Sequence, residues 1–327
     1  MATILKELED VKNRCIDEVP GSEIIACHPA AVRISIVKTR YKALAVCMQF
    51  QDGYPDQPII IEIKSKTLPE KLTDGLTKIC DGEAKKLLGK PQVLHIVKFV
   101  ERFLADNPFT VCSDELAFIK RELITGNDEI KTKQKSGVII VSIREEEYAM
   151  KMKLKVPDLY PEQQVRVESV EGNFPELFTK MFVAQAEETA RQCVQPPLKK
   201  KSKDPPFEPK PSLKPVAQYL IDCLRRYPTE CCPICKERAF TPKPEHTVND
   251  SSSERFVVWV YCGHIFHKGC LDEFFKTPPF TGGKKCPSCG KRIYHDMWKI
   301  TPKVAEERWA HQQARQRELD EVADFLQ

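Results

Sequence analysis

The sequence lacks three features, and each absence excludes a large class of proteins. It has no apolar run of about 18 residues or more, so no membrane-spanning helix is expected. It has no excess of one charge, since 51 Lys and Arg face 47 Asp and Glu and leave a net charge of +4. That balance argues against nucleic acid as the main partner. It has no apolar signal segment, because charges begin at Lys6, so we expect an intracellular protein of the nucleus, the cytoplasm or both.

Cysteine, by contrast, is abundant, with 14 residues. Disulfides are rare inside cells, so closely spaced cysteines there more often bind a metal. Eight of the cysteines fall between residues 223 and 289, most of them in pairs or beside histidines. The others are scattered and are interpreted as small buried side chains: Cys15, Cys27, Cys47, Cys80, Cys112 and Cys193.

A segment rich in proline and lysine, residues 195–215, divides the chain. It has no apolar period, and proline removes backbone donors and disfavours helix in the residue before it. We therefore predict a semi-extended linker. Its Lys199–Lys203 cluster has the composition of a nuclear import signal, although a solvated basic linker is the simpler interpretation.

Before this linker, one order of elements occurs twice. The first copy begins with a helical repeat of apolar side chains from Ile4 to Cys15 and has a turn at Tyr54-Pro55. Its strands are predicted at Glu23–His28, Val32–Thr39, Lys42–Phe50 and Ile59–Ile63. Its closing helices are predicted at Pro69–Leu88 and Val93–Leu104.

The second copy repeats this order, with Tyr160-Pro161 at the turn. Helices are predicted at Asp114–Leu123 and Pro175–Cys193. Strands are predicted at Glu129–Lys133, Val138–Ile143, Tyr148–Val156 and Val165–Val170. The strand from Tyr148 alternates cleanly, which places one face on a core. In the last helix, we predict a shared face of Leu177, Met181 and Ala184.

The segment after the linker carries metal-ligand residues at short spacings: Cys232 and Cys235, Cys262 and His264, His267 and Cys270, and Cys286 and Cys289. A two-residue spacer lets two thiolates of one tight turn reach a single ion, and zinc prefers four sulfur or nitrogen ligands. Eight ligands fill two closed sites without a position for water, so two structural Zn(2+) ions are predicted. Cys231 is an alternative first ligand, but the spacing favours Cys232.

The order helix, antiparallel meander, Tyr-Pro turn, strand and helix resembles the RWD domain, a relative of ubiquitin-conjugating enzymes. The resemblance implies an α+β fold with two RWD-like domains at residues 1–107 and 108–194. The linker at 195–215, a zinc-stabilised domain with a leading helix at 216–298 and a C-terminal helix at 299–327 would follow. Both copies depart from the family's usual proline after Tyr-Pro, with Pro58 one residue early in the first and Gln164-Val165 in the second.

Neither copy has the nucleophilic cysteine in an extended segment that a conjugating enzyme needs. Cys80 falls in a predicted helix and Cys193 at a helix end, and no His-Pro-Asn stretch precedes Cys80. Both copies are therefore interpreted as binding modules without catalytic activity of their own.

The ordered ligand set resembles the RING finger, in its subclass with two central histidines. By that resemblance the ligands interleave, and Cys232, Cys235, His267 and Cys270 hold one ion. Cys262, His264, Cys286 and Cys289 hold the other. The order alone leaves this pairing open. A plant-homeodomain finger is the nearest alternative, although it usually has cysteine where this chain has His264.

RING fingers generally act as ubiquitin ligases that hold a ubiquitin-charged conjugating enzyme without a covalent intermediate. The resemblance implies contact with that enzyme at Ile234, Phe274 and Pro287. The alternative is that Ile234 and Phe274 only pack the small core. Many active RINGs carry a cation directly after the last ligand, where this chain has Gly290, so Lys291 and Arg292 are the candidates for ubiquitin contact.

Tandem RWD-like modules before a RING resemble the RWD–RING ubiquitin ligase family, which includes the Fanconi anaemia ligase subunit. Our leading hypothesis is a RING-type ubiquitin transferase. Its expected partners are a conjugating enzyme, ubiquitin, and a protein substrate or complex partner bound by the RWD-like region. The alternative is a non-catalytic zinc-finger adaptor or scaffold, which Gly290 favours. A DNA-binding zinc protein has only Lys199–Lys203 in its support.

Overall fold

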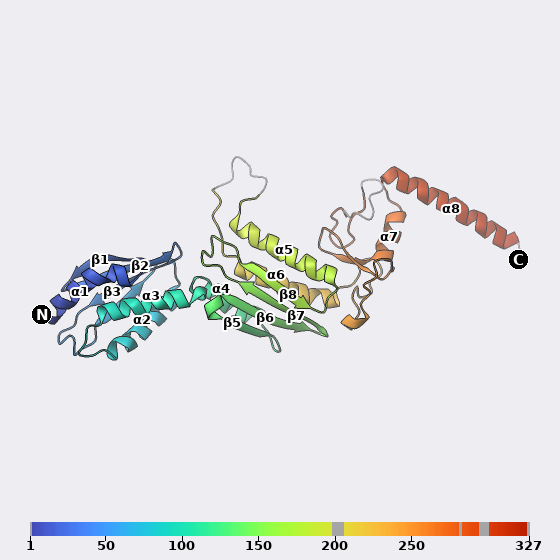
Figure 1. Cartoon of the computed structure of the whole chain (residues 1–327). Coiled ribbons are helices and arrows are strands. Elements are labelled where there is room, and N and C mark those ends of the chain that lie inside the picture. The colour runs from blue at the N-terminus through green and yellow to red at the C-terminus, as the bar shows by residue number, and fades with distance from the viewer. Residues whose placement is uncertain (1, 198–205, 281–282, 294–300, 326–327) are drawn as a thin grey trace. The chain divides into compact units, whose positions relative to one another are not determined.

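A computed structural model describes residues 2–197, 206–280, 283–293 and 301–325 of the chain (Figure 1). Lys199–Lys203, from the predicted linker, lies outside the described residues. The chain divides into two compact units. The first comprises Met1–Ile143, Lys151–Glu171 and Thr179–Ile221, and the second comprises Arg144–Met150, Gly172–Phe178 and Asp222–Gln327.

The first unit opens with helix α1 (Ala2–Glu18) and a sheet in the order β1-β2-β3-β4. The strands are β1 (Ser22–His28), β2 (Ala31–Thr39), β3 (Lys42–Gln49) and β4 (Ile60–Lys64), each antiparallel to its neighbour. Helices α2 (Glu70–Lys85) and α3 (Val93–Asp106) follow. The alternating apolar side chains of the strands form one core with these helices. The α+β fold that the pattern predicted is confirmed in this region.

A buried polar network joins the Tyr-Pro turn of this sheet to two helices. The Tyr54 hydroxyl donates to the carboxylate of Glu7 on α1 and accepts from the Gln92 backbone N–H at 3.0 Å. Glu7 also accepts the N–H groups of Gln92 and Val93, both at 2.7 Å. The first N–H groups of α3 have no partner within the helix, so this network satisfies them. Burial and the Glu7 carboxylate both raise the pKa of Tyr54, which keeps its hydroxyl a donor.

A second sheet has the order β5-β6-β7-β8. Its strands are β5 (Glu129–Lys133), β6 (Val138–Glu145), β7 (Tyr148–Lys155) and β8 (Arg166–Gly172). Along β7 the buried positions alternate as the sequence predicts, from Tyr148 to Leu154. Helix α4 (Ser113–Phe118) and a π-helical turn at Ile119–Leu123 precede the sheet, where one helix was predicted. Helices α5 (Glu176–Val194) and α6 (Leu213–Arg226) follow it.

The second Tyr-Pro turn carries a polar network with the same parts. The Tyr160 hydroxyl donates to Glu115 on α4 and accepts the N–H groups of Ser212 and Leu213, at 2.8 and 3.0 Å. Glu115 also accepts the Lys214 N–H at 2.9 Å. The first turn of α6 is therefore held as the first turn of α3 is. In both networks a side chain just before the helix accepts the N–H of the residue that directly precedes a strand. Ile59, before β4, donates to Gln92, and Val165, before β8, donates to Ser212.

The predicted face of α5 is wrong. Leu177 is 49% exposed and Ala184 is also exposed. The buried side chains are instead Phe178, Phe182, Ala186 and Ala190. Both sets have helical spacing, and the larger aromatic surface of the two phenylalanines gains more from burial.

The second unit contains the zinc-ligand segment. After α6, this unit contains the strands and α-helices β9 (Val257–Trp259), β10 (Ile265–His267), α7 (Lys268–Lys276) and α8 (Pro302–Phe325). The core of this segment is small and includes two of the ligands themselves: Cys232, Val258, Val260, Phe266, Leu271, Cys286 and Ile293. A core of this size supplies little stability, so the segment depends on a further stabilising element. Among the described residues, the helices are too short or too polar to cross a membrane.

Candidate metal centre and partner groove

The ligand residues form two groups of four in the second unit. One group contains Cys232, Cys235, His267 and Cys270, and the other contains Cys262, His264, Cys286 and Cys289. Within each group the ligand atoms all lie within 4.8 Å of one another. The structure thus brings the eight residues together in the interleaved pairing that the resemblance implied. Cys231 is exposed and belongs to neither group.

The ligand distances fit a tetrahedral zinc site. With Zn–S near 2.3 Å and Zn–N near 2.0–2.1 Å, a tetrahedron has a sulfur–nitrogen edge of about 3.6 Å. The observed edges are 3.3 Å from Cys235 Sγ to His267 Nδ1 and 3.9 Å from Cys270 Sγ to the same nitrogen. In the other group, Cys262 Sγ lies 3.4 Å from His264 Nδ1. Three thiols and one imidazole in each group form a closed donor set for a structural zinc ion.

Two backbone turns of the same form present the Cys-x2-Cys pairs. In the first, the Lys236 N–H donates to the Cys232 carbonyl at 2.9 Å, and in the second the Gly290 N–H donates to the Cys286 carbonyl at 2.8 Å. The residue after each second cysteine is left-handed, with φ of 65° at Lys236 and 67° at Gly290. We call these turns the first and second zinc turns. Each directs two sulfur atoms to one point.

Ionising some of the ligand thiols is costly without a cation, although burial at Cys232 is outweighed by hydrogen bonds, led by that of the His267 side chain, which lower the pKa of Cys232 to about 6. Burial, and then the neighbouring Cys235 thiol, raise the pKa of Cys270 to about 12. Burial also raises the pKa of Cys262 to about 11, against a backbone donor at His264. A dication removes this cost because it binds the thiolate forms directly. The donor chemistry therefore fits zinc, and the expectation of two structural zinc sites is confirmed.

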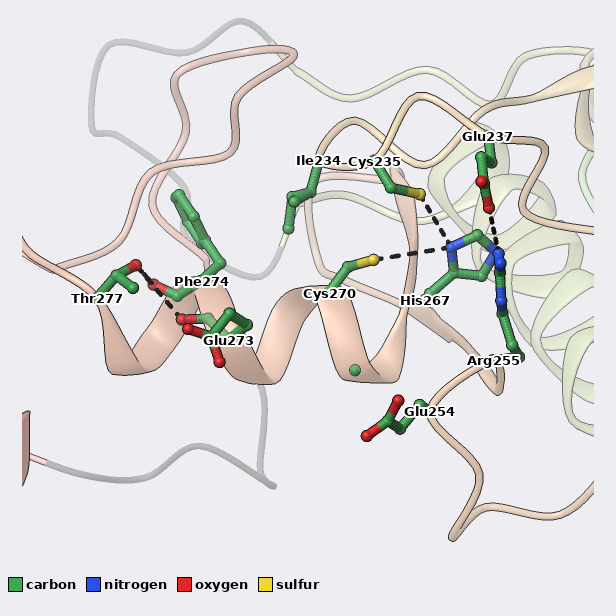
Figure 2. A pocket seen from close by; sticks show the side chains of 11 residues that line it. Ile234, Cys235, Glu237, Glu254, Arg255, His267, Cys270, Glu273, Phe274 and Thr277 are labelled. Atoms are coloured by element: carbon green, nitrogen blue, oxygen red, sulfur yellow. Dashed lines mark hydrogen bonds and ion pairs between the residues drawn. The ribbon is translucent and has the colours of Figure 1, made fainter. Parts of the chain in front are cut away.

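A groove runs along the first zinc group, and three of that group's ligands, Cys235, His267 and Cys270, line part of it (Figure 2). Ile234, on the first zinc turn, and Phe274, on α7, both line it, and Thr277 extends it. Both apolar side chains are partly buried against the finger's core and still reach the groove. They therefore serve the core and remain available for contact. Pro287 is exposed but does not line this groove.

The groove has an acidic rim that the sequence did not indicate. Glu237, Glu254 and Glu273 line it together with Arg255, which pairs with Glu237. These residues come from three separate segments. Glu254 reaches the rim because the Gly269 N–H donates to its carbonyl at 2.8 Å, and a Cβ at Gly269 would lie 2.8 Å from the Glu254 Cβ. No local motif could have revealed this arrangement.

Lys284 holds one wall of the groove and was also missed. It is only 7% exposed, and its ammonium lies 4.8 Å from the centre of the Phe274 ring. The ammonium also donates to the Thr277 carbonyl. Burial lowers the pKa of Lys284. The cation thus packs Phe274 from behind and satisfies a carbonyl at the end of α7.

The candidate ubiquitin contacts lie on the second zinc turn. Lys291 and Arg292 are exposed, and the Lys291 carbonyl accepts the Cys286 N–H at 2.8 Å. Arg292 pairs with Lys285 in an isolated antiparallel bridge. A Cβ at Gly290 would meet no atom within 4 Å.

Two family models match the sequence at the positions that the geometry singles out. Residues 232–289 match the zinc finger of C3HC4 type, the RING finger. Residues 4–104 match the RWD domain. The chain combines an RWD domain with a RING finger. The RING finger here has His267 where the C3HC4 type has its fifth ligand as cysteine, in line with the two central histidines noted from the sequence.

The first cysteine after the Tyr54-Pro55 turn of the RWD domain, Cys80, is not accessible. Cys80 lies in α2 with no exposed surface, and burial raises its pKa to about 12. A thioester-forming cysteine needs both access and a thiolate at neutral pH. Cys80 has neither, so it is unsuited to form a thioester.

Proposed function

We propose that this protein is a RING-type ubiquitin ligase, in which the groove of Ile234 and Phe274 holds a ubiquitin-charged conjugating enzyme. A RING finger and an RWD domain fit a ligase-type role or a zinc-finger adaptor. The observation that favours the ligase is the groove beside the first zinc group, where two apolar side chains from separate segments stay partly open.

The proposed chemistry requires no reacting group from this chain. The amine of a lysine attacks the thioester carbonyl, an isopeptide bond forms, the amine loses a proton, and the cysteine thiolate of the conjugating enzyme leaves. The finger accelerates this transfer by holding the charged enzyme in the reactive arrangement. Two closed zinc sites suit this role because they fix the groove walls without offering an open metal position.

The rim of the groove suggests what the partner carries. Three carboxylates and one paired arginine line the groove together with the two apolar side chains. An acidic rim speeds the approach of a basic partner surface. We propose that the preferred conjugating enzyme presents an apolar side chain flanked by lysine or arginine.

We propose that the RWD-like region recruits the substrate or complex partner. The second sheet, at residues 129–172, repeats the strand order and the buried Tyr–Glu network of the RWD domain. These repeats support a second RWD-like module that includes α6, whose first turn joins the network. Nuclear or cytoplasmic placement is part of the same proposal.

The test is discharge of ubiquitin from a panel of charged conjugating enzymes onto free lysine. Native protein is compared with Ile234→Ala, and with Tyr261→Ala as a matched control, because Tyr261 is 85% exposed and lies outside the groove. Truncating a central contact residue is expected to weaken binding about tenfold. Discharge should fall by that factor in Ile234→Ala alone, with zinc content unchanged.

The adaptor is the second candidate, and Gly290 after the last ligand is the observation that favours it. Absence of discharge with every conjugating enzyme, from native protein that retains both zinc ions, would establish the adaptor over the ligase.

A further inference from the structure

The tip of a β-hairpin far from the finger in sequence belongs to the same compact unit as the finger. Strands β6 and β7 are joined by a turn at Glu146 and Glu147, and the hairpin tip, Arg144–Met150, lies in the second unit. The segment Gly172–Phe178 belongs to that unit as well. The tip therefore has contacts with the zinc-ligand segment that can be described residue by residue.

Aromatic rings form the centre of this contact. Tyr148 of the tip lies 4.7 Å from Phe174 and 6.1 Å from Phe240, measured between ring centres. Phe178 lies 4.9 Å from Phe240 and stacks on Trp259 at 6.3 Å. Phe240 follows the first zinc turn, so buried aromatic contacts connect the tip to that turn.

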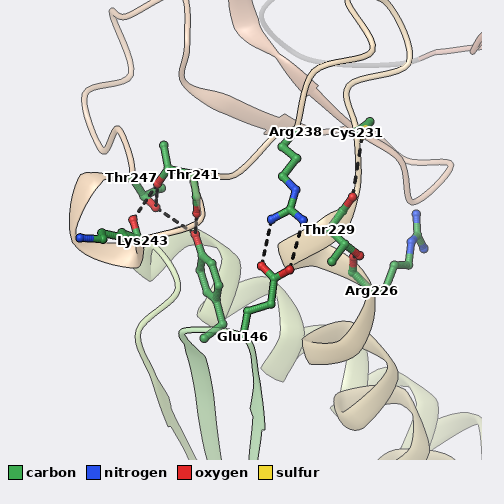
Figure 3. A network of polar contacts seen from close by, with 9 residues as sticks. Glu146, Arg226, Thr229, Cys231, Arg238, Thr241, Lys243 and Thr247 are labelled. Atoms are coloured by element: carbon green, nitrogen blue, oxygen red, sulfur yellow. Dashed lines mark hydrogen bonds and ion pairs between the residues drawn. The ribbon is translucent and has the colours of Figure 1, made fainter.

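Directed polar contacts fix the same region (Figure 3). The Glu146 carboxylate accepts two bonds from the Arg238 guanidinium, at 2.9 and 3.1 Å. The Tyr148 hydroxyl donates to the Thr241 carbonyl at 2.8 Å and lies 3.2 Å from the Thr247 hydroxyl. A bidentate pair of a guanidinium and a carboxylate fixes the relative orientation of the two side chains as well as their distance.

The backbone conformation of Glu146 indicates that this position needs a glutamate side chain. Glu146 has a φ of 52°, in the left-handed region. Hairpin turns usually place Gly, Asn or Asp at such a position, because other side chains are strained there. A glutamate at this position needs an interaction that offsets the backbone strain. The hydrogen bond between its carboxylate and Arg238 is that interaction.

Arg238 is built into the first zinc turn. It pairs with Cys231 in an antiparallel bridge, and the Cys232 N–H donates to the Glu237 carbonyl at 2.8 Å. The Ala239 N–H donates to the Glu230 carbonyl at 2.9 Å. These bonds make the two arms of the turn one rigid loop, with Ile234 at its apex. A contact that holds Arg238 therefore also fixes Ile234.

We propose that Glu146 and Tyr148 are positioning residues for the conjugating-enzyme groove. They hold Arg238 and Thr241, and through the rigid turn they keep Ile234 in the place where the partner meets it. This inference rests on the proposed ligase function for its effect on partner binding. Its structural part, the hold on the first zinc turn, stands independently of that function.

The experiment uses the full chain with Glu146→Gln and Tyr148→Phe, and Glu147→Gln as the matched control. Glu147 shares the turn and the charge of Glu146, but its carboxylate is exposed and has no described partner. The first measurement is hydrogen exchange at the Cys232 and Lys236 amides in the protein alone. Loss of an exposed charge pair is expected to speed this exchange about fivefold in Glu146→Gln, with native rates in Glu147→Gln.

The second measurement is the Kd for a conjugating enzyme, together with the discharge rate at saturation. A displaced Ile234 should weaken the Kd about fivefold and leave both the saturated rate and the zinc content unchanged. The double variant Glu146→Arg with Arg238→Glu restores the pair and should recover native values. If the pair had only a structural role, its loss would lower thermal stability. It would not weaken the Kd while leaving the saturated rate unchanged, and the double variant would not recover the native Kd.

The two ideas fail in different ways. Native exchange rates at Cys232 and Lys236 in both Glu146→Gln and Tyr148→Phe would overturn the hold on the zinc turn, whatever the ligase assay shows. Faster exchange in a protein that binds no conjugating enzyme in its native form would overturn the proposed function and the groove part of this inference with it.

Discussion

The sulfur of Cys235 lies 3.3 Å from Nδ1 of His267, although 32 residues separate the two in sequence. The loop between them, which includes β9 and the ligands Cys262 and His264, must close for this distance to exist. Closing so long a loop has an entropic cost that a small core cannot offset. A structural zinc ion, with about 10–16 kcal/mol of apparent binding free energy, can offset it.

Loss of one ligand should therefore remove one zinc ion and loosen the finger. Cys286→Ser deletes a ligand of the second group and a residue of the small core. We expect about one zinc ion per chain in place of two, measured by elemental analysis, and loss of protection at the Gly290 amide. The core of α1, α2, α3 and the first sheet contains none of these ligands and should keep its signal.

Cys231→Ser is the matched control for this prediction. Cys231 is next to a ligand in sequence but is exposed and belongs to neither group. Two zinc ions should remain bound. A drop to one in this variant would mean that the first group uses Cys231 in solution.

A cation at position 290 should raise ligase activity. Lys236 occupies the equivalent left-handed position of the first zinc turn, which shows that the turn accepts a long cationic side chain. A Cβ at Gly290 meets nothing within 4 Å, so Gly290→Arg should cost only the left-handed backbone, about 1–2 kcal/mol. We expect faster discharge in Gly290→Arg than in native protein. Gly290→Gln, with the same backbone cost and no charge, should show no gain.

The Tyr160 hydroxyl should be needed to hold the start of α6. Tyr160→Phe removes the hydroxyl that accepts the buried N–H groups of Ser212 and Leu213, and it leaves the Ser212 group without its acceptor. Unsatisfied buried groups cost about 1–3 kcal/mol each. Hydrogen exchange at these two amides should speed up strongly, while Tyr261→Phe, at an 85% exposed site, should leave them as in native protein.

The Glu115 carboxyl should make the second network sensitive to pH. Burial raises its pKa, against the hydrogen bonds from Tyr160 and Lys214 that lower it. The folded state then holds a proton that the unfolded state has lost, so stability falls as pH rises from the ordinary glutamate pKa to the raised one. An NMR titration of the Glu115 carboxyl carbon should show a midpoint above about 4.3. A midpoint at or below that value would contradict the prediction.

The strands and ligands were predictable because their signals are local. Alternation along β7 and the two-residue spacings of Cys232 and Cys286 lie within a few residues of one another. The buried face of α5 was not, because two sets of side chains share helical spacing there. Only packing decides that Phe178 turns inward and Leu177 outward.

The rim of the groove and the hold on the zinc turn depend on residues distant in sequence. Glu254 reaches the groove through a close approach to Gly269. Glu146 meets Arg238 across 92 residues. Neither pair leaves a local pattern, and a glutamate in a hairpin turn attracts attention only when its left-handed backbone is known.

The interleaved zinc groups also determine how the finger must be made. Synthesis releases Cys232, Cys235, Cys262 and His264 before either His267 or Cys270. Those first four residues already form a complete set of zinc ligands, but a wrong one, since they come from both groups. A nascent chain that captures metal at this stage must exchange ligands later to reach the native pairing. The order in which the ligands are synthesised therefore differs from the order in which they pair in the native finger.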